Sequence, residues 1–373
     1  MAGTNLKGLE TSFGQVGEFE DLSDIIRDAS GYDTPLFSYL ARGKATNLTH
    51  EWIEDARRKT TTTLAANVTT SISTVTVADG TMFVIGDTIL VDSEVMRISN
   101  ISGSSLTVSR GWGGTAGGLT TFHASGATVI RLGYAGIAGA DAPSANTTLK
   151  TRKSNYVQSF ENAVFVSFEE RGQRNVGGDE YDYQVAKRMK EHAVAMELSI
   201  LYGAKKIGTA TTPSTSGGLK EFITTTTFNF SGTITQAQFE SKLRTIYTNA
   251  GADKPDLLLV SPVMLEAMLF WARGTLRTTL ADKKIGVEVM QAITPYGIMD
   301  VLLDRHLVSG QFFALQTNAL KWCPLKGDNS YDTKLYPLAR TGSYDKAMIL
   351  TMATLERTQE AAHGFFSGVT GGA

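Results

Sequence analysis

Cysteine is almost absent from this chain of 373 residues, in which Cys323 is the only one. A single cysteine forms neither an internal disulfide framework nor a cysteine-rich zinc site. Net charge is almost absent too, because 35 Lys and Arg residues balance 37 Asp and Glu residues to a formal charge of −2. The chain therefore has no general attraction to nucleic acid or acidic membranes. Any contact with DNA is expected to be weak and local.

Long hydrophobic runs are also missing. No stretch approaches the roughly 18 uninterrupted apolar residues of a membrane helix, and residues 1–20 lack the basic start and apolar core of a secretory signal. We therefore expect no membrane segment, and a chain that is made and kept in the cytosol. The 42% hydrophobic and 19% charged residues are ordinary for a folded protein. At this length we expect two or three packed units.

Residue patterns that bind phosphate or a hard cation are not evident. The glycine-rich stretch 111–118 lacks the lysine and the following helix that a phosphate-binding loop needs. Asp87, Asp92 and Glu94 lie close in sequence and could offer oxygens to a cation. We favour turns and solvated faces of hairpins for them, because no EF-hand-like loop is present.

Catalytic and metal-binding patterns are equally weak. Cys323 stands between Trp322 and Pro324, which favours a packed, small apolar residue over a nucleophile. No histidine stands at metal-ligand spacing from another; the five are His50, His123, His192, His306 and His363. The sequence thus predicts no catalytic, cofactor-binding or metal-binding residue and a protein that is not an enzyme. A hydrolase with a distant Ser, His and Asp set remains an alternative.

The sequence also contains clear structural patterns, and the first is a β-rich segment. From about residue 64 to 132 Ser, Thr, Gly and Val dominate in short alternating runs, which predicts a small all-β module. Extended segments flank it, one around Trp52 and one around Phe160 in residues 156–168. The module is therefore predicted to be inserted at the tip of a long hairpin.

The strongest helical pattern covers residues 179–205. Apolar residues recur there at spacings of three and four, namely Ala186, Met189, Ala193, Met196 and Ile200. At about 1.5 Å per residue this helix spans about 40 Å, which is longer than most globular domains need. We interpret it as a spine.

Strands and helices alternate in the second half. Residues 257–260 form a continuous apolar run, typical of a strand buried on both faces, and Ser261 followed by Pro262 predicts the start of a helix. The other predicted strands are residues 287–293, 298–303, 312–315, 334–340 and 347–355. The fold class is therefore α+β.

The order of these parts resembles the major capsid proteins of tailed bacteriophages, which have the Hong Kong 97 fold. Three short motifs carry a closer resemblance to one capsid family. Asp33-Thr34-Pro35 lies near the start, Glu51-Trp52 lies on the rising strand of the hairpin, and Phe168-Glu169 precedes the step into the long helix. The resemblance covers most of the chain apart from the β-module.

The resemblance implies a division of the chain. It places an N-terminal arm and short helix in residues 1–46, extended-loop strands in 47–63 and 133–168, an inserted β-domain in 64–132, a peripheral domain with the spine helix in 169–221 and 331–373, and an axial domain in 222–330.

The implied function is a structural one. Subunits would self-assemble as hexamers and pentamers into the icosahedral or prolate head shell of a virion, around a double-stranded DNA genome, in the host cytoplasm. The expected partners are further copies of the chain, a scaffolding protein, a portal, and DNA through weak local contacts, with a decoration protein also allowed and no membrane. A nanocompartment shell of the encapsulin type and a phage tail or fibre protein remain alternatives.

Two departures from the family pattern bear on assembly. Family members often carry a scaffolding segment ahead of the arm, so we expect either a separate scaffolding protein or a processed chain. Lys44, Lys59 and Asn67 lie in the loop region, but no motif supports covalent cross-links between neighbours. Glycine-rich residues 133–139 and 172–178 are the expected bending points.

A long hairpin buries little of its own surface, so its apolar strands need cover from a neighbouring subunit. We therefore predict inter-subunit contacts at Trp52, Phe160, Phe165, Arg171 and Arg174.

Overall fold

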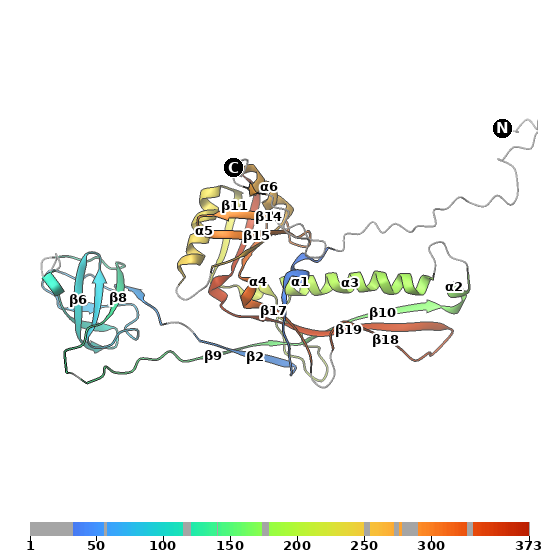
Figure 1. Ribbon diagram of the computed structural model, residues 1–373, viewed down its shortest axis with the longest axis horizontal. Helices are drawn as coiled ribbons and strands as arrows, with labels where there is room; N and C mark the ends of the chain where they lie inside the picture. Colours follow the sequence, from blue (N-terminus) through green and yellow to red (C-terminus); the bar gives the residue numbers. More distant parts are fainter. Residues whose placement is uncertain are drawn as a thin grey trace, which may run out of the picture.

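The computed structural model places two β-sheets, a small β-barrel and a protruding two-stranded loop along one chain (Figure 1). It describes residues 33–55, 58–114, 121–139, 141–173, 179–249, 254–271, 276–277, 290–326 and 331–372. The mixture of helices and sheets confirms the α+β class. The predicted arm before residue 33 lies outside the described residues.

The first sheet has five strands and lies beneath a long helix. Its order is β1-β17-β19-β10, with β18 also paired to β19. Phe160, Val164 and Val166 are buried on one face of β10, and this face packs against the helix. The strands are β1 (Ala41–Arg42), β10 (Gln158–Ser167), β17 (Leu320–Pro324), β18 (Lys334–Pro337) and β19 (Tyr344–Arg357).

The long helix is α3, Glu180–Tyr202, and the prediction of a spine helix is confirmed. The Asp179 side chain caps its first turn by accepting a hydrogen bond from the backbone N–H of Tyr181 at 2.9 Å. With 23 residues it spans about 35 Å. Met196, Ile200 and Leu201 bury its second half against the five-stranded sheet, beside Phe160 and Trp322.

Short helices surround α3. The predicted short helix after Asp33-Thr34-Pro35 is confirmed as α1, Pro35–Tyr39. The others are α2 (Phe168–Gly172) and α4 (Leu219–Phe222). Elsewhere in the chain, 3-10 turns occur at η2 (Trp112–Gly114), η4 (Thr317–Ala319) and η5 (Glu360–Ala362). No helix in the described ranges is long and apolar enough to cross a membrane.

The second sheet has seven strands in the order β11-β20-β16-β12-β15-β14-β13. All four residues of β12 are buried, as predicted from its apolar run. The rings of Phe312 and Phe366 stack at 4.3 Å between centroids in its core. The strands are β11 (Thr227–Ile234), β12 (Leu257–Val260), β13 (Leu276–Arg277), β14 (Met290–Thr294), β15 (Gly297–Leu303), β16 (Phe312–Leu315) and β20 (Gly364–Gly372).

Two helices pack against this sheet, and each begins directly after a capping residue. Thr235 and Gln238 form a reciprocal capping box that starts α5, Gln236–Thr248. The helix α6, Pro262–Trp271, follows Ser261 with proline at its first position. The aromatic ring of Phe239 on α5 contacts both Phe312 and Trp271, which joins the two helices to the sheet.

The structure corrects the predicted division of the chain in three places. β10 lies in the five-stranded sheet, paired with β19 along its length, and is not a strand of the hairpin. β17 also lies in that sheet, although residues 222–330 were assigned to another unit. β20, which the sequence analysis did not detect, lies between β11 and β16 in the seven-stranded sheet rather than with residues 331–357. Strand partners depend on long-range contacts, which local patterns do not encode.

The β-rich segment forms a six-stranded sheet in the order β3-β8-β5-β6-β7-β4. Backbone hydrogen bonds of 2.9 Å from Ala65 to Thr76 and from Ala78 to Thr63 join the two outer strands, so the sheet closes into a barrel. The strands are β3 (Thr61–Thr63), β4 (Thr74–Thr76), β5 (Asp87–Val91), β6 (Glu94–Ser102), β7 (Ser105–Ser109) and β8 (Thr128–Tyr134). Its core is separate from those of the other sheets.

Two buried carboxyl groups connect α1, α3 and the turn after β15. The Glu197 side chain accepts backbone hydrogen bonds from Leu36 at 3.0 Å and Phe37 at 2.6 Å, and Asp304 accepts one from His306 at 2.8 Å. Burial, and then the neighbouring Asp304 charge, raise the pKa of Glu197 to about 8. Two neighbouring carboxyl groups in a buried site resist ionising together, so Glu197 keeps its proton at neutral pH.

The Glu197 and Asp304 pair predicts a specific pH dependence. Its stabilising contribution is complete below the ordinary pKa of a carboxyl group and is lost as the pH rises through about 8. Asp304→Asn removes one charge and supplies an N–H donor, so it should raise the free energy of unfolding at about pH 9 by about 1–2 kcal/mol. Thermal unfolding of the unassembled subunit between about pH 6 and pH 9 measures this. Asp33→Asn, at an exposed carboxylate, is the control, and an equal pH slope in both variants would refute the assignment.

Candidate functional site

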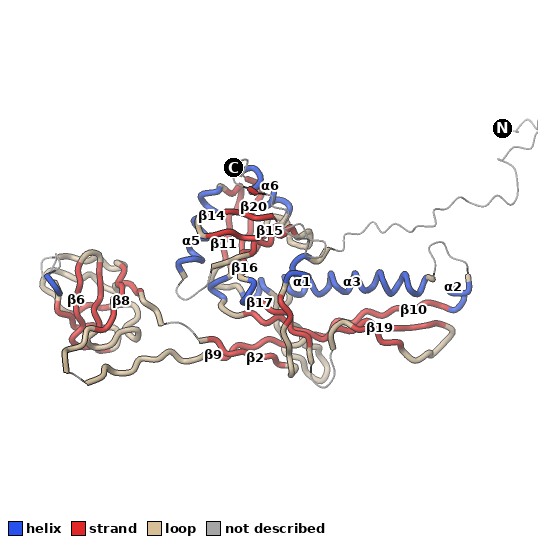
Figure 2. Tube along the Cα trace, viewed as in Figure 1, coloured by secondary structure: helices blue, strands red, loops and turns tan. Residues whose placement is uncertain are grey.

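The extended loop protrudes from the body of the molecule (Figure 2). It comprises residues 47–55, 135–139 and 141–156, and its paired strands are β2 (Thr49–Glu54) and β9 (Thr151–Tyr156). These strands pair antiparallel, from Thr49 opposite Tyr156 to Glu54 opposite Thr151. The β-barrel lies at the far end of this loop (Figure 1). The strand that partners β2 is thus β9, and not the predicted segment around Phe160. A two-stranded ribbon is at best marginally stable alone, so its root must hold it in place.

Asn155 is the centre of that root. Its side chain is fully buried. The Nδ2 group donates to the Ser216 hydroxyl, to the Gly217 carbonyl and to the Leu355 carbonyl at 2.8 Å, while Oδ1 accepts from the backbone N–H of Gly217 at 2.9 Å. One amide thus connects β9 to the segment after α3 and to β19. Because these bonds are buried and directional, they fix the angle at which the loop leaves the body.

Further polar contacts hold both strands of the loop at this point. Lys205 donates to the Ser154 hydroxyl at 3.1 Å, and Ser214 donates to the Val157 carbonyl at 2.6 Å. On the rising strand, His50 Nε2 lies 2.9 Å from the Glu356 carboxylate on β19. The root therefore depends on polar contacts from β2, β9 and β19.

Cys323 lies in the same region. The Sγ atom is 3.6 Å from Glu356 Oε2, and the residue is fully buried. Burial, and then the Glu356 charge, raise the pKa of the thiol to about 12, so it is protonated and a poor nucleophile near neutral pH.

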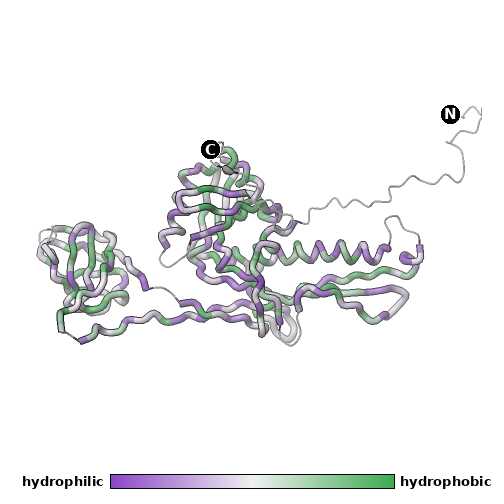
Figure 3. Tube along the Cα trace, viewed as in Figure 1, coloured by the Kyte–Doolittle hydropathy of each residue, from purple (hydrophilic) through white to green (hydrophobic). Residues whose placement is uncertain are grey.

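Beyond the root, the extended loop exposes large apolar side chains. Figure 3 shows hydrophobic and hydrophilic residues interspersed along it, whereas hydrophobic residues gather in the strands of the sheets. The most exposed are Leu149 at 88%, Ile137 at 72%, Ile53 at 66% and Leu48 at 62%. A ribbon with apolar groups on its surface is a typical contact surface for another protein.

The predicted contact residues lie in different environments. Trp52 is half-buried on β2, and its indole N–H donates to Glu54 at 2.9 Å. Phe165 is 59% exposed at the end of β10, where its ring contacts Tyr344. Phe160 is buried in the core of its own chain and offers little surface to a neighbour. Arg174 lies outside the described residues.

Arg171 is engaged within its own chain. It donates to Asp345 at 2.5 Å and to Asp179 at 2.9 Å, which connects α2 to β19 and to the N-cap of α3. Hydrogen bonding to these two carboxylates raises the pKa of Arg171. All three side chains reach solvent, so the cluster positions the start of the helix without contributing much to stability.

The acidic residues singled out in the barrel form internal ion pairs. Asp87 binds Arg131 through two hydrogen bonds of 2.6 and 2.7 Å. Glu94 accepts from Arg110 at 2.7 Å and faces His123 at 2.8 Å. Burial opposes ionisation of Glu94, but these hydrogen bonds outweigh it and lower the pKa of this carboxyl. The carboxylates are thus neutralised by side chains of the barrel itself.

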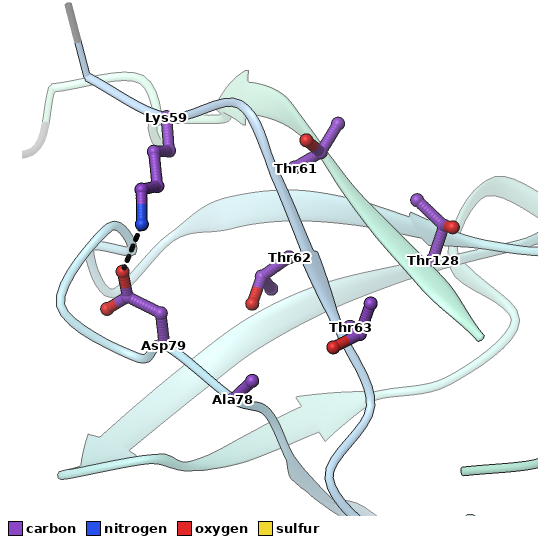
Figure 4. Close-up of a pocket in the computed structure, with 7 residues that line it drawn as sticks. All are labelled: Lys59, Thr61, Thr62, Thr63, Ala78, Asp79 and Thr128. Atoms are coloured by element: carbon purple, nitrogen blue, oxygen red, sulfur yellow. Dashed lines mark ion pairs between the residues drawn. The ribbon is translucent and has the colours of Figure 1, made fainter. Parts of the chain in front are cut away.

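An open groove of about 630 Å³ lies on the barrel (Figure 4). Lys59 Nζ and Asp79 Oδ2 form an ion pair of 3.7 Å at one side. The lining residues are Lys59, Thr61, Thr62, Thr63, Ala78, Asp79 and Thr128. Threonine hydroxyl groups without an adjacent base are weak nucleophiles, so this lining does not amount to a catalytic set.

Comparison with known proteins identifies the family of this chain. The family model of the SU10 major capsid protein matches residues 4–370. The chain belongs to the SU10 major capsid protein family. It is thus a structural protein of the virion capsid that forms the head shell. No curated protein matches the chain.

A solved phage capsid agrees with the Hong Kong 97 fold of this capsid protein. The capsid of cyanophage A-1(L) matches with a TM-score of 0.53 and 12% identity over 95% of this chain and 97% of that chain. A structure from Mycobacterium phage Bobi gives a TM-score of 0.49 and 10% identity over 95% and 96%. The capsid of a native GTA particle gives 0.49 and 8% over 96% of each chain. The family match favours the head shell over the nanocompartment and the tail or fibre alternatives.

Asn155→Ala should destabilise the capsid protein by about 2–4 kcal/mol, because it leaves buried partners such as the Gly217 N–H and the Leu355 carbonyl unsatisfied. Urea unfolding of the unassembled subunit measures the loss. Asn146→Ala is the matched control, since Asn146 is half-buried on the same loop and its side chain makes one hydrogen bond within the described part of the chain, to the Thr81 carbonyl. Equal stability of the two variants would show that the root does not depend on this amide.

Proposed function

We propose that the capsid subunits build a closed shell of hexamers and pentamers, in which each extended loop lies across a neighbouring subunit. The observation that carries this proposal is the exposed apolar surface of a loop that is held only at its root. Leu149, Ile137 and Ile53 each have more than half of their surface exposed to solvent. Covering such side chains contributes about 25 cal/mol for each Å² removed from water, which favours association with another copy.

The two sheets take different positions in this arrangement. The five-stranded sheet with α3 forms the peripheral domain, and the seven-stranded sheet with α5 and α6 forms the axial domain at the centre of each capsomer. Exposed apolar side chains on the seven-stranded unit support this assignment, because Phe270, Ile293 and Ile298 are each more than half exposed. Identical subunits in a ring cover such patches by heterologous contacts that close on themselves.

The remaining partners follow from the head-shell function. A scaffolding protein and a portal take part in assembly, which occurs in the host cytoplasm, and a decoration protein can bind the outer surface. Contact with packaged DNA is weak and local, because a formal charge of −2 provides no general attraction to phosphate. The protein acts by assembly and has no enzymatic activity of its own.

Ile53→Asp and Leu149→Asp should each lower the yield of shells at least about tenfold, because a buried unpaired charge at the contact costs more than about 1.4 kcal/mol. Electron microscopy and sedimentation of the purified protein measure the yield. Subunit folding should be unaffected, since both side chains are exposed in the single chain. Ile85→Asp is the control, at an apolar residue of the barrel that is 52% exposed. Normal shells from both loop variants would refute the proposed contact.

Replacing the barrel, residues 61–134, by a short flexible linker should leave a subunit that still assembles. The backbone N–H of Arg131 donates to the Thr60 carbonyl at 2.8 Å, so the two ends of the barrel are neighbours and a linker can join them. The barrel also has its own core. Shells of the parental diameter are expected in electron micrographs. Folded subunits that form no particles would show that the barrel is integral to the shell.

A further inference from the structure

Three side chains of different chemistry converge at the root of the extended loop. His50 comes from β2, Cys323 from β17 and Glu356 from β19, and their potential ligand atoms all lie within 4.8 Å of one another. Imidazole nitrogen, thiolate sulfur and carboxylate oxygen are the three ligand types that zinc takes in proteins.

The distances are near those of a tetrahedral ion. His50 Nε2 lies 2.9 Å and Cys323 Sγ lies 3.6 Å from the same oxygen, Glu356 Oε2. With bond lengths of about 2.0–2.3 Å, neighbouring ligand atoms of a zinc site lie roughly 3.3–3.7 Å apart. Small side-chain movements therefore suffice to place an ion between the three atoms.

The surroundings suit a divalent cation in a partly closed site. Cys323 is fully buried, while the side chains of His50 and Glu356 are 14% and 18% exposed. A Cβ on Gly43 would clash with the sulfur, so the backbone of residues 43–45 covers the inner side of the cluster. Because His50 and Glu356 reach solvent, water can supply a fourth ligand.

The charges are also compatible. One thiolate and one carboxylate balance the two positive charges of the ion, because a coordinating thiol loses its proton. Lys321 Nζ lies 3.6 Å from the other carboxylate oxygen, Glu356 Oε1, and therefore leaves Oε2 free to face the cluster. The sulfur favours zinc over magnesium or calcium, which prefer oxygen ligands.

We propose that His50, Cys323 and Glu356 bind one zinc ion per subunit, which connects the rising strand of the extended loop to the two strands β17 and β19 of the five-stranded sheet. The ion reinforces the same root that Asn155 holds through hydrogen bonds. It acts as a structural cross-link between parts of the chain that are far apart in sequence. Binding does not depend on shell formation, so it can be measured separately from assembly.

Cobalt(II) provides the test, with the unassembled full-length subunit stripped of metal by a chelator. We expect binding of one Co²⁺ per subunit with visible bands of tetrahedral cobalt and a near-ultraviolet sulfur-to-cobalt charge-transfer band. Because Cys323 is the only cysteine, a thiolate band identifies its donor without ambiguity. Elemental analysis of shells purified without chelator should give about one zinc per subunit.

Variants distinguish metal binding at this cluster from metal binding elsewhere in the subunit. Cys323→Ser should abolish the charge-transfer band, and His50→Gln and Glu356→Gln should each weaken binding at least about tenfold. Lys321→Gln removes a competing positive charge and keeps all three ligands, so it should bind at least as tightly as the parent. His306→Gln, at a histidine outside the cluster, should bind like the parent.

One experimental result would overturn the proposal. If the folded parental subunit gives no charge-transfer band and its shells carry no stoichiometric zinc, the three side chains form a hydrogen-bonded cluster only. This result needs no variant, so it stands even if a substitution prevents folding. Electron microscopy of the same preparations shows independently whether the subunit assembles.

Discussion

The attachment of the extended loop to the five-stranded sheet is the contact on which the rest of the architecture depends. The loop carries exposed apolar side chains outward, yet its root is polar and largely buried, with Asn155 bonded to two separate segments. The root and the outer surface of the loop differ for a physical reason. Hydrogen bonds fix direction and apolar surface provides affinity, so a rigid root lets a non-directional surface meet its partner in one orientation.

Much of the fold could be predicted from the sequence because the signals are local. The Asp179 N-cap, the proline after Ser261 and the continuous apolar run of β12 act within a few residues, and all three produce the expected element. Strand partners could not be predicted in this way. Residues 158–167 have the same extended pattern whether they pair with β2 or with β19, and only packing beneath α3 decides between these partners.

The candidate site was less accessible to sequence reasoning. A hairpin's need for cover pointed to Phe165 and Phe160 alike. It could not separate the exposed Phe165 from Phe160, which lies five positions earlier and is buried beneath α3. The root was missed because its members, such as His50, Asn155 and Glu356, come from strands far apart in the chain. Sequence spacing reveals ligands only when one helix or loop supplies them, and here the sheet brings them together.

The closed barrel at the tip of the loop has an evolutionary consequence. Its outer strands are hydrogen-bonded to each other, its charged residues are neutralised internally, and its two connections to the loop leave from adjacent positions. Substitutions in such a module have few ways to disturb the geometry of the rest of the chain. Its surface can therefore accept substitutions, and one module can be exchanged for another, with little constraint from the shell lattice.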